Sequence, residues 1–253
     1  MELHGIKDKV VIITGGGRGI GKSAGIALAQ SGAKVVIVSR TQAEVEDTVK
    51  EIKNASFEAM GIVADVTKED KVQEMVRGVL EKYGNIDVLI NNAGVSFRKT
   101  LLDTTLEDWE KLMAVNLKGM YLCTREVLSL MIKKRSGRII NVSSRAGNQP
   151  FEEHAAYCTS KYGIIGFTEA MAMELAKHNI HVNVVCPDRI LSEMSRANIP
   201  KGEDLKNWMT TDELAGVFVF LVSDEAKTIN GAKINSYGFA GFGIAGFGTA
   251  GFM

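Results

Sequence analysis

Short apolar stretches alternate with longer amphipathic ones along most of the chain. The short stretches are rich in Val and Ile and continuous in their apolar character, which is typical of parallel strands covered on both faces. Charged residues interrupt the longer stretches, and apolar residues recur there at helical spacing, as in Val45, Val49 and Ile52. The strands are predicted at 9–14, 34–39, 58–64, 86–91, 137–143 and 181–186, and the helices at 22–30, 42–54, 68–83, 105–134 and 155–178. This order predicts an α/β fold, a single doubly wound parallel sheet of the Rossmann type with helices on both faces.

No linker divides this pattern, so we expect one domain over residues 1–239 and a separate tail over 240–253. The tail is an uncharged repeat of Ala, Gly and Phe, and two interpretations of it stay open. Its glycines favour a flexible segment. Alternatively, Phe242, Phe247 and Phe252 dock on a neighbouring subunit, because exposed phenylalanines are a liability.

Composition narrows the range of partners. Lys and Arg number 30 and Asp and Glu also number 30, so no net field attracts nucleic acid or a membrane surface, and a small-molecule partner is expected. The three cysteines are far apart in apolar surroundings, and no apolar run approaches the length of a membrane span. We therefore expect reduced thiols in a cytoplasmic protein. The four histidines offer no plausible set of ligands, so no metal site is expected.

A glycine-rich loop follows the first predicted strand directly and leads into a helix. It comprises Thr14-Gly15-Gly16-Gly17-Arg18-Gly19-Ile20-Gly21. A pyrophosphate needs a tight turn, a close backbone approach and free N–H groups at a helix N-terminus, and Gly15, Gly19 and Gly21 can supply these. A strand-to-helix turn can also use glycines for structural reasons alone, but the position after the first strand favours dinucleotide binding.

The second strand ends at Ser39-Arg40, where an NAD-specific protein would usually carry an acid for the ribose hydroxyls. No acid is present at this position. Arg18 and Arg40 can together face a 2′-phosphate, which predicts NADP as the cofactor, while NAD remains possible.

Tyr157 and Lys161 are four residues apart in a segment with helical spacing, so both side chains should lie on one helix face. We expect the ammonium to lower the pKa of the phenol and make it an acid/base that works near neutral pH. On its own, such a pair is usually only a surface contact.

Further motifs accompany this pair in a fixed order. They are the glycine loop, Asn91-Asn92-Ala93-Gly94, Asn116, Ser143-Ser144 and Tyr157-x-x-Ser160-Lys161. Together they make residues 7 to 236 resemble the short-chain dehydrogenase/reductase family. The resemblance implies an NAD(P)-dependent enzyme that transfers a hydride between nicotinamide and a carbonyl or alcohol.

The resemblance also implies a role for each matching position. Tyr157 would be the acid/base, Lys161 would hold the ribose, Ser144 rather than Ser143 would bind the substrate oxygen, and Asn116 would support a proton relay. Asp65-Val66 would meet the adenine ring. The cofactor-binding residues expected in this way are Gly15, Arg18, Gly19, Ile20, Gly21, Ser39, Arg40, Asp65, Val66, Asn91, Ala93, Gly94, Tyr157, Lys161, Pro187 and Ile190.

Several departures from the family pattern concern the substrate rather than the hydride chemistry. Asp188 stands where the family has a glycine, and the segment after it is short for a substrate lid. Positions at which 3-oxoacyl-acyl-carrier-protein reductases typically carry arginines are Ser129 and Met173. We therefore favour a ketone, sugar or polyol substrate, with a 3-oxoacyl thioester as the alternative.

Two further possibilities concern activity and assembly. A nucleotide-sensing or scaffold protein that has lost catalysis is compatible with the altered Asp188 loop. The family resemblance implies a homodimer or homotetramer formed through the helices at 105–134 and 155–178.

Overall fold

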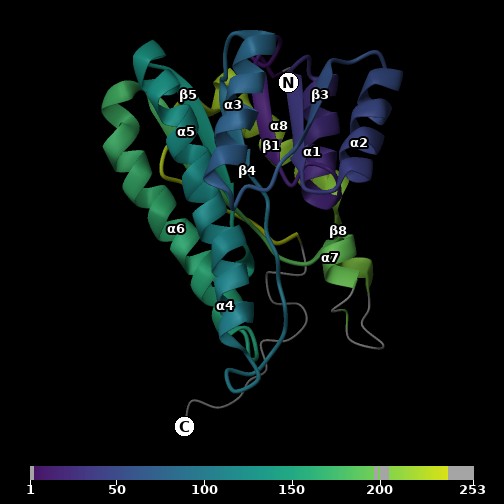
Figure 1. The fold of residues 1–253 in the computed structure, drawn as a ribbon, viewed down its shortest axis with the longest axis vertical. Coiled ribbons are helices and arrows are strands. Elements are labelled where there is room, and N and C mark those ends of the chain that lie inside the picture. The colour runs from purple at the N-terminus through teal and green to yellow at the C-terminus, as the bar shows by residue number, and fades with distance from the viewer. Residues whose placement is uncertain (1–2, 197–198, 200–204, 239–253) are drawn as a thin grey trace.

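The centre of the protein is a parallel sheet of seven strands, in the order β3-β2-β1-β4-β5-β6-β9 (Figure 1). The structure is a computed structural model, and it describes residues 3–196, 199 and 205–238. The strands of this sheet are β1 (Val10–Thr14), β2 (Lys34–Ser39), β3 (Ala59–Val63), β4 (Val88–Asn91), β5 (Gly137–Val142), β6 (Ile180–Pro187) and β9 (Lys233–Ser236). The predicted fold class, a doubly wound α/β sheet, is confirmed.

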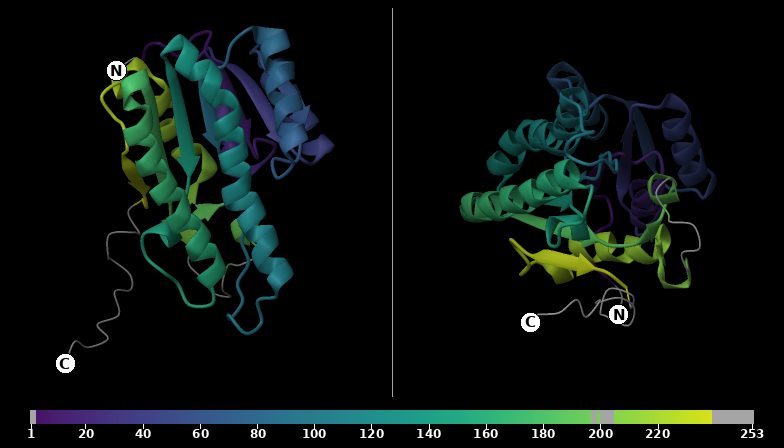
Figure 2. Two further views of the ribbon diagram at one scale, coloured as in Figure 1. Left: turned by 60° about the vertical axis from the view of Figure 1, so that its left-hand side comes forward. Right: turned by 90° about the horizontal axis from the view of Figure 1, so that it is seen from below.

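Helices cover both faces of the sheet, and each face has its own apolar core (Figure 2). On one face lie α1 (Gly19–Gln30), α2 (Gln42–Asn54) and α8 (Thr211–Val222). On the other lie α3 (Glu69–Tyr83), α5 (Gly119–Lys134) and α6 (Ala155–Leu175). The continuous apolar runs of β1, β4 and most of β6 are buried because helices pack on both sides of them.

The predicted helix at 105–134 is interrupted. It consists of α4 (Leu106–Met113), a π-helical segment η1 (Ala114–Lys118) and α5. Between β6 and α8 lie the short helix α7 (Glu193–Arg196) and two strands of two residues each, β7 (Ile190–Leu191) and β8 (Met209–Thr210). The two strands pair with each other.

The connections place the carboxyl ends of the central strands at one edge of the sheet. The chain runs outward from β1 to β2 and β3 on one side, and from β4 to β5, β6 and β9 on the other. The crevice between β1 and β4 is therefore a topological switch point, where open α/β sheets bind ligands.

In the part of the chain that the structure describes, no helix is long and apolar enough to cross a membrane. The predicted tail at 240–253, with its docking phenylalanines, lies outside the described residues.

Candidate active site

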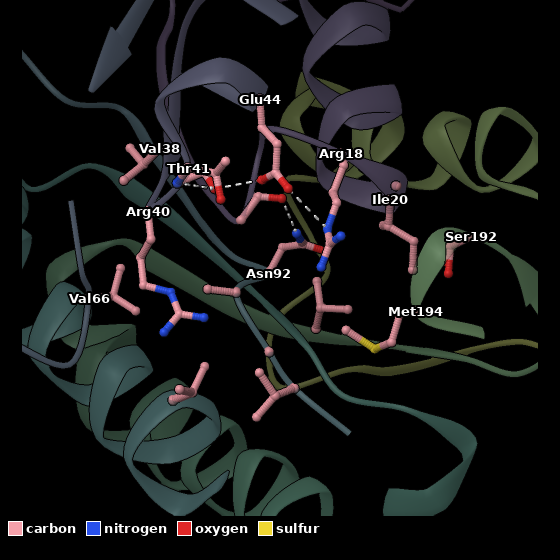
Figure 3. Close-up of a pocket in the computed structure, with 18 of the residues that line it drawn as sticks. Arg18, Ile20, Val38, Arg40, Thr41, Glu44, Val66, Asn92, Ser192 and Met194 are labelled. Atoms are coloured by element: carbon pink, nitrogen blue, oxygen red, sulfur yellow. Dashed lines mark hydrogen bonds and ion pairs between the residues drawn. The ribbon is translucent and has the colours of Figure 1, made fainter. Parts of the chain in front are cut away.

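A pocket lies at the switch point, at the carboxyl edge of the sheet (Figure 3). It is lined by Gly15, Arg18, Gly19, Ile20, Val38, Ser39, Arg40, Thr41, Glu44, Ala64, Asp65, Val66, Asn92, Ala93, Gly94, Val95, Val115, Val142, Ser143, Tyr157, Lys161, Ser192, Glu193 and Met194. Most of the residues expected from the sequence to contact a cofactor are thus brought to one groove.

The glycine loop adopts a backbone that side chains would prevent. Gly15 has φ 63° and Gly19 has φ 54°, both in the left-handed region. A Cβ on Gly21 would collide with the carbonyl oxygen of Gly15, so Gly21 packs behind the loop and does not line the pocket. The side chain of Arg18, the N-cap of α1, makes no capping hydrogen bond, so the first N–H groups of the helix lack a side-chain acceptor. This cradle fits a diphosphate.

Arg18 and Arg40 line the same end of the pocket, but their guanidinium groups lie apart (Figure 3). Arg18 Nε is 3.5 Å from Glu44 Oε1, and the hydroxyl of Ser39 donates to Glu44 Oε2 at 3.0 Å. Glu44 was not expected here, because it enters the pocket from the first turn of α2 rather than from the end of β2.

Asp65 and Val66 follow β3 and line the pocket where an adenine ring was expected. The carboxylate of Asp65 accepts hydrogen bonds from the N–H and the hydroxyl of Thr67. Burial acts to raise the pKa of Asp65, but these bonds and the charge of Arg40 bring it below its ordinary value. Asp65 therefore lines the pocket with a charged carboxylate, which also stabilises the turn after β3 through its bonds to Thr67.

The segment after β4 joins the glycine loop to the rest of the pocket. The side-chain amide of Asn92 donates to the carbonyl oxygens of Thr14 and Gly15, at 3.1 and 3.0 Å. A Cβ on Gly94 would lie 3.4 Å from Asn116 Oδ1 and 3.7 Å from Lys161 Nζ. Ala93 and Gly94 thus present bare backbone to the groove.

Asn91 does not line the pocket, contrary to the expectation. Its amide donates to Thr124 Oγ1 and Asn141 Oδ1 inside the α5 face of the sheet. The reason is the alternation of side chains along a strand, which turns Asn91 away from the groove that its neighbour Asn92 enters.

Tyr157, Lys161 and Ser144 meet beside the central part of the groove. Lys161 Nζ lies 5.6 Å from the centre of the Tyr157 ring and donates to the carbonyl oxygen of Val142 at 3.0 Å. The side chain of Ser144 lies beside the Tyr157 hydroxyl and acts to lower the pKa of Tyr157. Ser143, the less favoured serine, lines the pocket but donates its hydroxyl to the carbonyl of Lys161 at 2.8 Å. Ser144 is therefore the serine whose hydroxyl faces the phenol.

The protonation of this group differs from the expectation. The expected net lowering of the Tyr157 pKa is not found: burial raises the pKa of Tyr157, and the neighbouring Ser144 offsets this only in part. Burial also lowers the pKa of Lys161 to about 8. For both groups, loss of hydration on burial is the largest cause of the pKa shift.

Asn116 occupies the π-helical segment η1 and is almost fully buried. Its amide donates to the carbonyl of Val95 and to Ser160 Oγ, both at 3.0 Å, and its oxygen accepts from the N–H of Val95 at 2.8 Å. Asn116 thus fixes the backbone after Gly94, and it lies just behind the pocket wall. Single-turn π segments are frequent at functional sites.

Asp188 does not obstruct the groove. Its carboxylate turns away to Arg145 Nη1 at 2.8 Å, and the guanidinium of Arg145 lies between the rings of Phe151 and Tyr237, 5.7 Å from each. Pro187 and Ile190, expected at the cofactor, are not among the described lining residues. Ser192, Glu193 and Met194 form this wall instead, because the chain turns into the groove only after β7.

Within residues 3–196, 199 and 205–238, no group of three or more His, Cys, Asp or Glu side chains is arranged to hold a metal ion. The free cysteines Cys123, Cys158 and Cys186 are all buried.

Comparison with known proteins agrees with this geometry. A family model described as short chain dehydrogenase matches residues 9–202. The chain is 38% identical over 236 residues to the 3-oxoacyl-[acyl-carrier-protein] reductase of Synechocystis sp., which covers 91% of this chain and 96% of that protein.

Solved structures are similar over nearly their full length. The structure of gox2181 has a TM-score of 0.88 at 31% identity and covers 91% of this chain and 95% of that one. An actinorhodin polyketide ketoreductase with NADPH has a TM-score of 0.87 at 28% identity and covers 93% of this chain and 98% of its own. The chain belongs to the short-chain dehydrogenase/reductase family and is an NAD(P)-dependent oxidoreductase.

Proposed function

We propose that this protein interconverts a ketone and a secondary alcohol with NADP(H), using Tyr157 as the acid/base. One observation carries the proposal: Tyr157 and Lys161, with Ser144 beside Tyr157, line a groove whose far end is the glycine cradle of α1. A phenol that exchanges a proton beside a dinucleotide groove fits carbonyl reduction, where negative charge develops on the substrate oxygen.

The chain's own groups have separate tasks in this reaction. The bound nicotinamide supplies or accepts the hydride. The Tyr157 hydroxyl donates a proton to the carbonyl oxygen, and the Ser144 hydroxyl beside it orients that oxygen. The Lys161 ammonium stabilises the phenolate that remains. Asn116 is a positioning residue, since its bonds to Val95 hold the groove wall.

Several residues are placed to hold the cofactor. The backbone of Gly15, Gly19 and Ile20 would hold the diphosphate, and Asp65 and Val66 the adenine. Arg18, Ser39 and Arg40 support NADP over NAD, because guanidinium groups and a hydroxyl suit a 2′-phosphate and the end of β2 carries no acid. A structural neighbour was solved with NADPH.

A second substrate class deserves a test, because relatives of this chain are 3-oxoacyl-acyl-carrier-protein reductases. An acidic carrier protein would need a basic docking surface. Here Met173 is 84% exposed and Ser129 is exposed, and neither carries charge. This surface favours free ketones over carrier-bound thioesters.

A cytoplasmic location and a homodimer or homotetramer remain predictions. Exposed Tyr121 on α5 and exposed Tyr162 and Met173 on α6 support an interface on these two helices. Light scattering on the full chain measures the assembly, and a monomeric mass would reject it.

The test is a screen of ketones, diketones, sugars and acyl thioesters with NADPH and NADH. NADPH carrying deuterium at the transferable position should place it on the carbon of the product alcohol. The scaffold alternative predicts tight NADP(H) binding with no label in any product. Reduction of acyl-carrier-protein thioesters in clear preference to free ketones would replace the first substrate class with the second.

A further inference from the structure

Glu44 lies between the two groups that the proposed function assigns to a 2′-phosphate. Its carboxylate accepts the hydroxyl hydrogen of Ser39 at 3.0 Å through one oxygen and lies 3.5 Å from Arg18 Nε through the other. Figure 3 shows the Arg18 guanidinium turned toward Glu44, with Arg40 extending elsewhere in the pocket.

These contacts occupy donors that an anion would need. Ser39 has a single O–H, and that hydrogen is given to Glu44. The side chain of Arg18 is 58% exposed and that of Glu44 27% exposed, so water screens their pair and an incoming group can replace it. Glu44 therefore competes with a bound phosphate for Arg18 and Ser39 without excluding it.

The base of the Glu44 side chain is held against the glycine loop. The backbone of Gly17 packs so closely on Glu44 that a Cβ there would lie 2.7 Å from Glu44 Cβ. One turn further along α2, Thr48 donates its hydroxyl to the carbonyl of Gly17 at 3.0 Å. The glycine loop and α2 are thus fixed to each other, and the charge of Glu44 stays at the mouth of this end of the groove.

We propose that Glu44 limits the preference of this protein for a 2′-phosphorylated dinucleotide and keeps NAD(H) as a usable second cofactor. The carboxylate repels a 2′-phosphate and withholds Arg18 and Ser39 from it. It also accepts a hydrogen bond from an unphosphorylated ribose hydroxyl, the task for which NAD-binding folds use an acid. The inference rests on the proposed cofactor site and assigns its specificity to a residue outside the end of β2.

The experiment measures binding rather than turnover. Calorimetric titration of the full chain with 2′,5′-ADP and with 5′-AMP compares the two adenosine ends directly. In Glu44→Gln, the ratio of the affinities should shift toward 2′,5′-ADP by about fivefold, the size of one exposed charge interaction. Glu46→Gln is the matched control, because it removes an exposed charge from the same helix outside the pocket, and its ratio should stay at the wild-type value.

Two further variants separate specificity from folding. Glu44→Asp keeps the charge on a shorter side chain and should move the ratio in the same direction by less. In an Arg18→Ala background, the effect of Glu44→Gln should shrink, because the two residues act on the same phosphate.

A ratio that is unchanged or that shifts toward 5′-AMP in both Glu44 variants overturns the inference. If both dinucleotides still bind and support reduction in that case, the proposed function stands. If neither fragment and neither dinucleotide binds the folded wild-type chain, the inference and the proposed function are both overturned.

Discussion

The titratable groups at the two edges of the central sheet differ in whether a partner compensates their burial. At the amino edge, Asp87 precedes β4, accepts from the N–H of Val10 at 2.9 Å and pairs with Lys134 at 2.7 Å. Burial acts to raise the pKa of Asp87, but these partners bring it below its ordinary value. At the carboxyl edge, burial raises the pKa of Tyr157 and lowers that of Lys161 to about 8, with no carboxylate paired to Lys161 among the described residues.

This difference distinguishes a structural charge from a chemical one. Asp87 is held firmly in its ionised form, so it fastens β1, β4 and α5 together and does not exchange protons near neutral pH. Tyr157 and Lys161 are held toward their neutral forms, and Lys161, whose pKa is lowered to about 8, changes its charge close to neutral pH. Uncompensated burial of titratable groups in a groove is typical of an active site.

Replacing Lys161 with Met should have the largest effect on the carboxyl edge. The methionine fills similar space but cannot stabilise the phenolate, so kcat for reduction should fall about 100-fold or more. The free energy of unfolding should stay close to that of the wild type, because no ion pair is broken. Steady-state kinetics and urea denaturation of the same samples measure the rate and the stability. If unfolding of the variant accounts for the whole loss of rate, Lys161 has a structural role and not a chemical one.

Replacing Asp87 with Ala should have the reverse effect. It removes the ion pair with Lys134, which keeps its bonds to Asn85 and Ile86, and leaves the N–H of Val10 without this acceptor. The free energy of unfolding should fall by about 2 kcal/mol, while kcat of the folded protein is unchanged. Because the pKa of Asp87 is lowered in the fold, its contribution is present above the ordinary Asp pKa of about 4 and is lost as pH falls below it. Wild type and variant should therefore converge in acid.

Asp70→Ala is the control for this change, since Asp70 is exposed and 4.0 Å from its nearest cation, Lys71. It should alter stability by less than about 0.5 kcal/mol. If Asp87→Ala and Asp70→Ala lower the free energy of unfolding equally, the buried contacts of Asp87 do not contribute specifically to stability.

The pH dependence of reduction tests whether the Lys161 ammonium is needed for the reaction. The Lys161 ammonium is present at low pH and is lost as pH rises through about 8. The kcat/KM for ketone reduction should thus be level below this value and fall above it, by about tenfold per pH unit at most. Lys161→Met should lack this inflection, and a wild-type profile that stays level well above this pKa would refute the assignment.

The smallest effect is expected at the ion pair between Arg145 and Asp188, near the carboxyl edge. The side chains of Arg145 and Asp188 are 19% and 9% exposed, and their pair joins the turn after β5 to the end of β6. Asp188→Asn should cost about 1 kcal/mol of stability and leave NADPH affinity unchanged, while exposed Asp47→Asn should cost nothing measurable. A marked loss of NADPH binding with normal stability would place Asp188 in the site.

Much of the fold was predictable because six strands are continuous apolar runs. The seventh, β9, was missed because Lys233 and Asn235 alternate with partly buried residues on a short edge strand. Helix α8 was also missed, since its Val-Phe-Val-Phe run is typical of a strand. Its capping box, Thr210 with Glu213, was the available signal. The π segment around Asn116 follows from a tertiary contact with Val95, which local periodicity does not encode.

The site was predictable where a motif ties a residue type to a backbone position, as at Gly15, Gly19, Tyr157 and Lys161. It was not predictable where two elements meet. Glu44 reaches the pocket only because α2 packs on the glycine loop. The protonation of Tyr157 depends on how deeply α6 is buried, and helical spacing says nothing of burial.

The central claim is that the Tyr157 hydroxyl donates the proton in a dinucleotide groove. Its most direct test is Tyr157→Phe, with NADPH affinity and the rate of ketone reduction measured on the same preparation. The affinity should stay within about twofold of the wild type while the rate falls by about a thousandfold, the range of a lost general acid. Retention of the wild-type rate in the phenylalanine variant would contradict the claim.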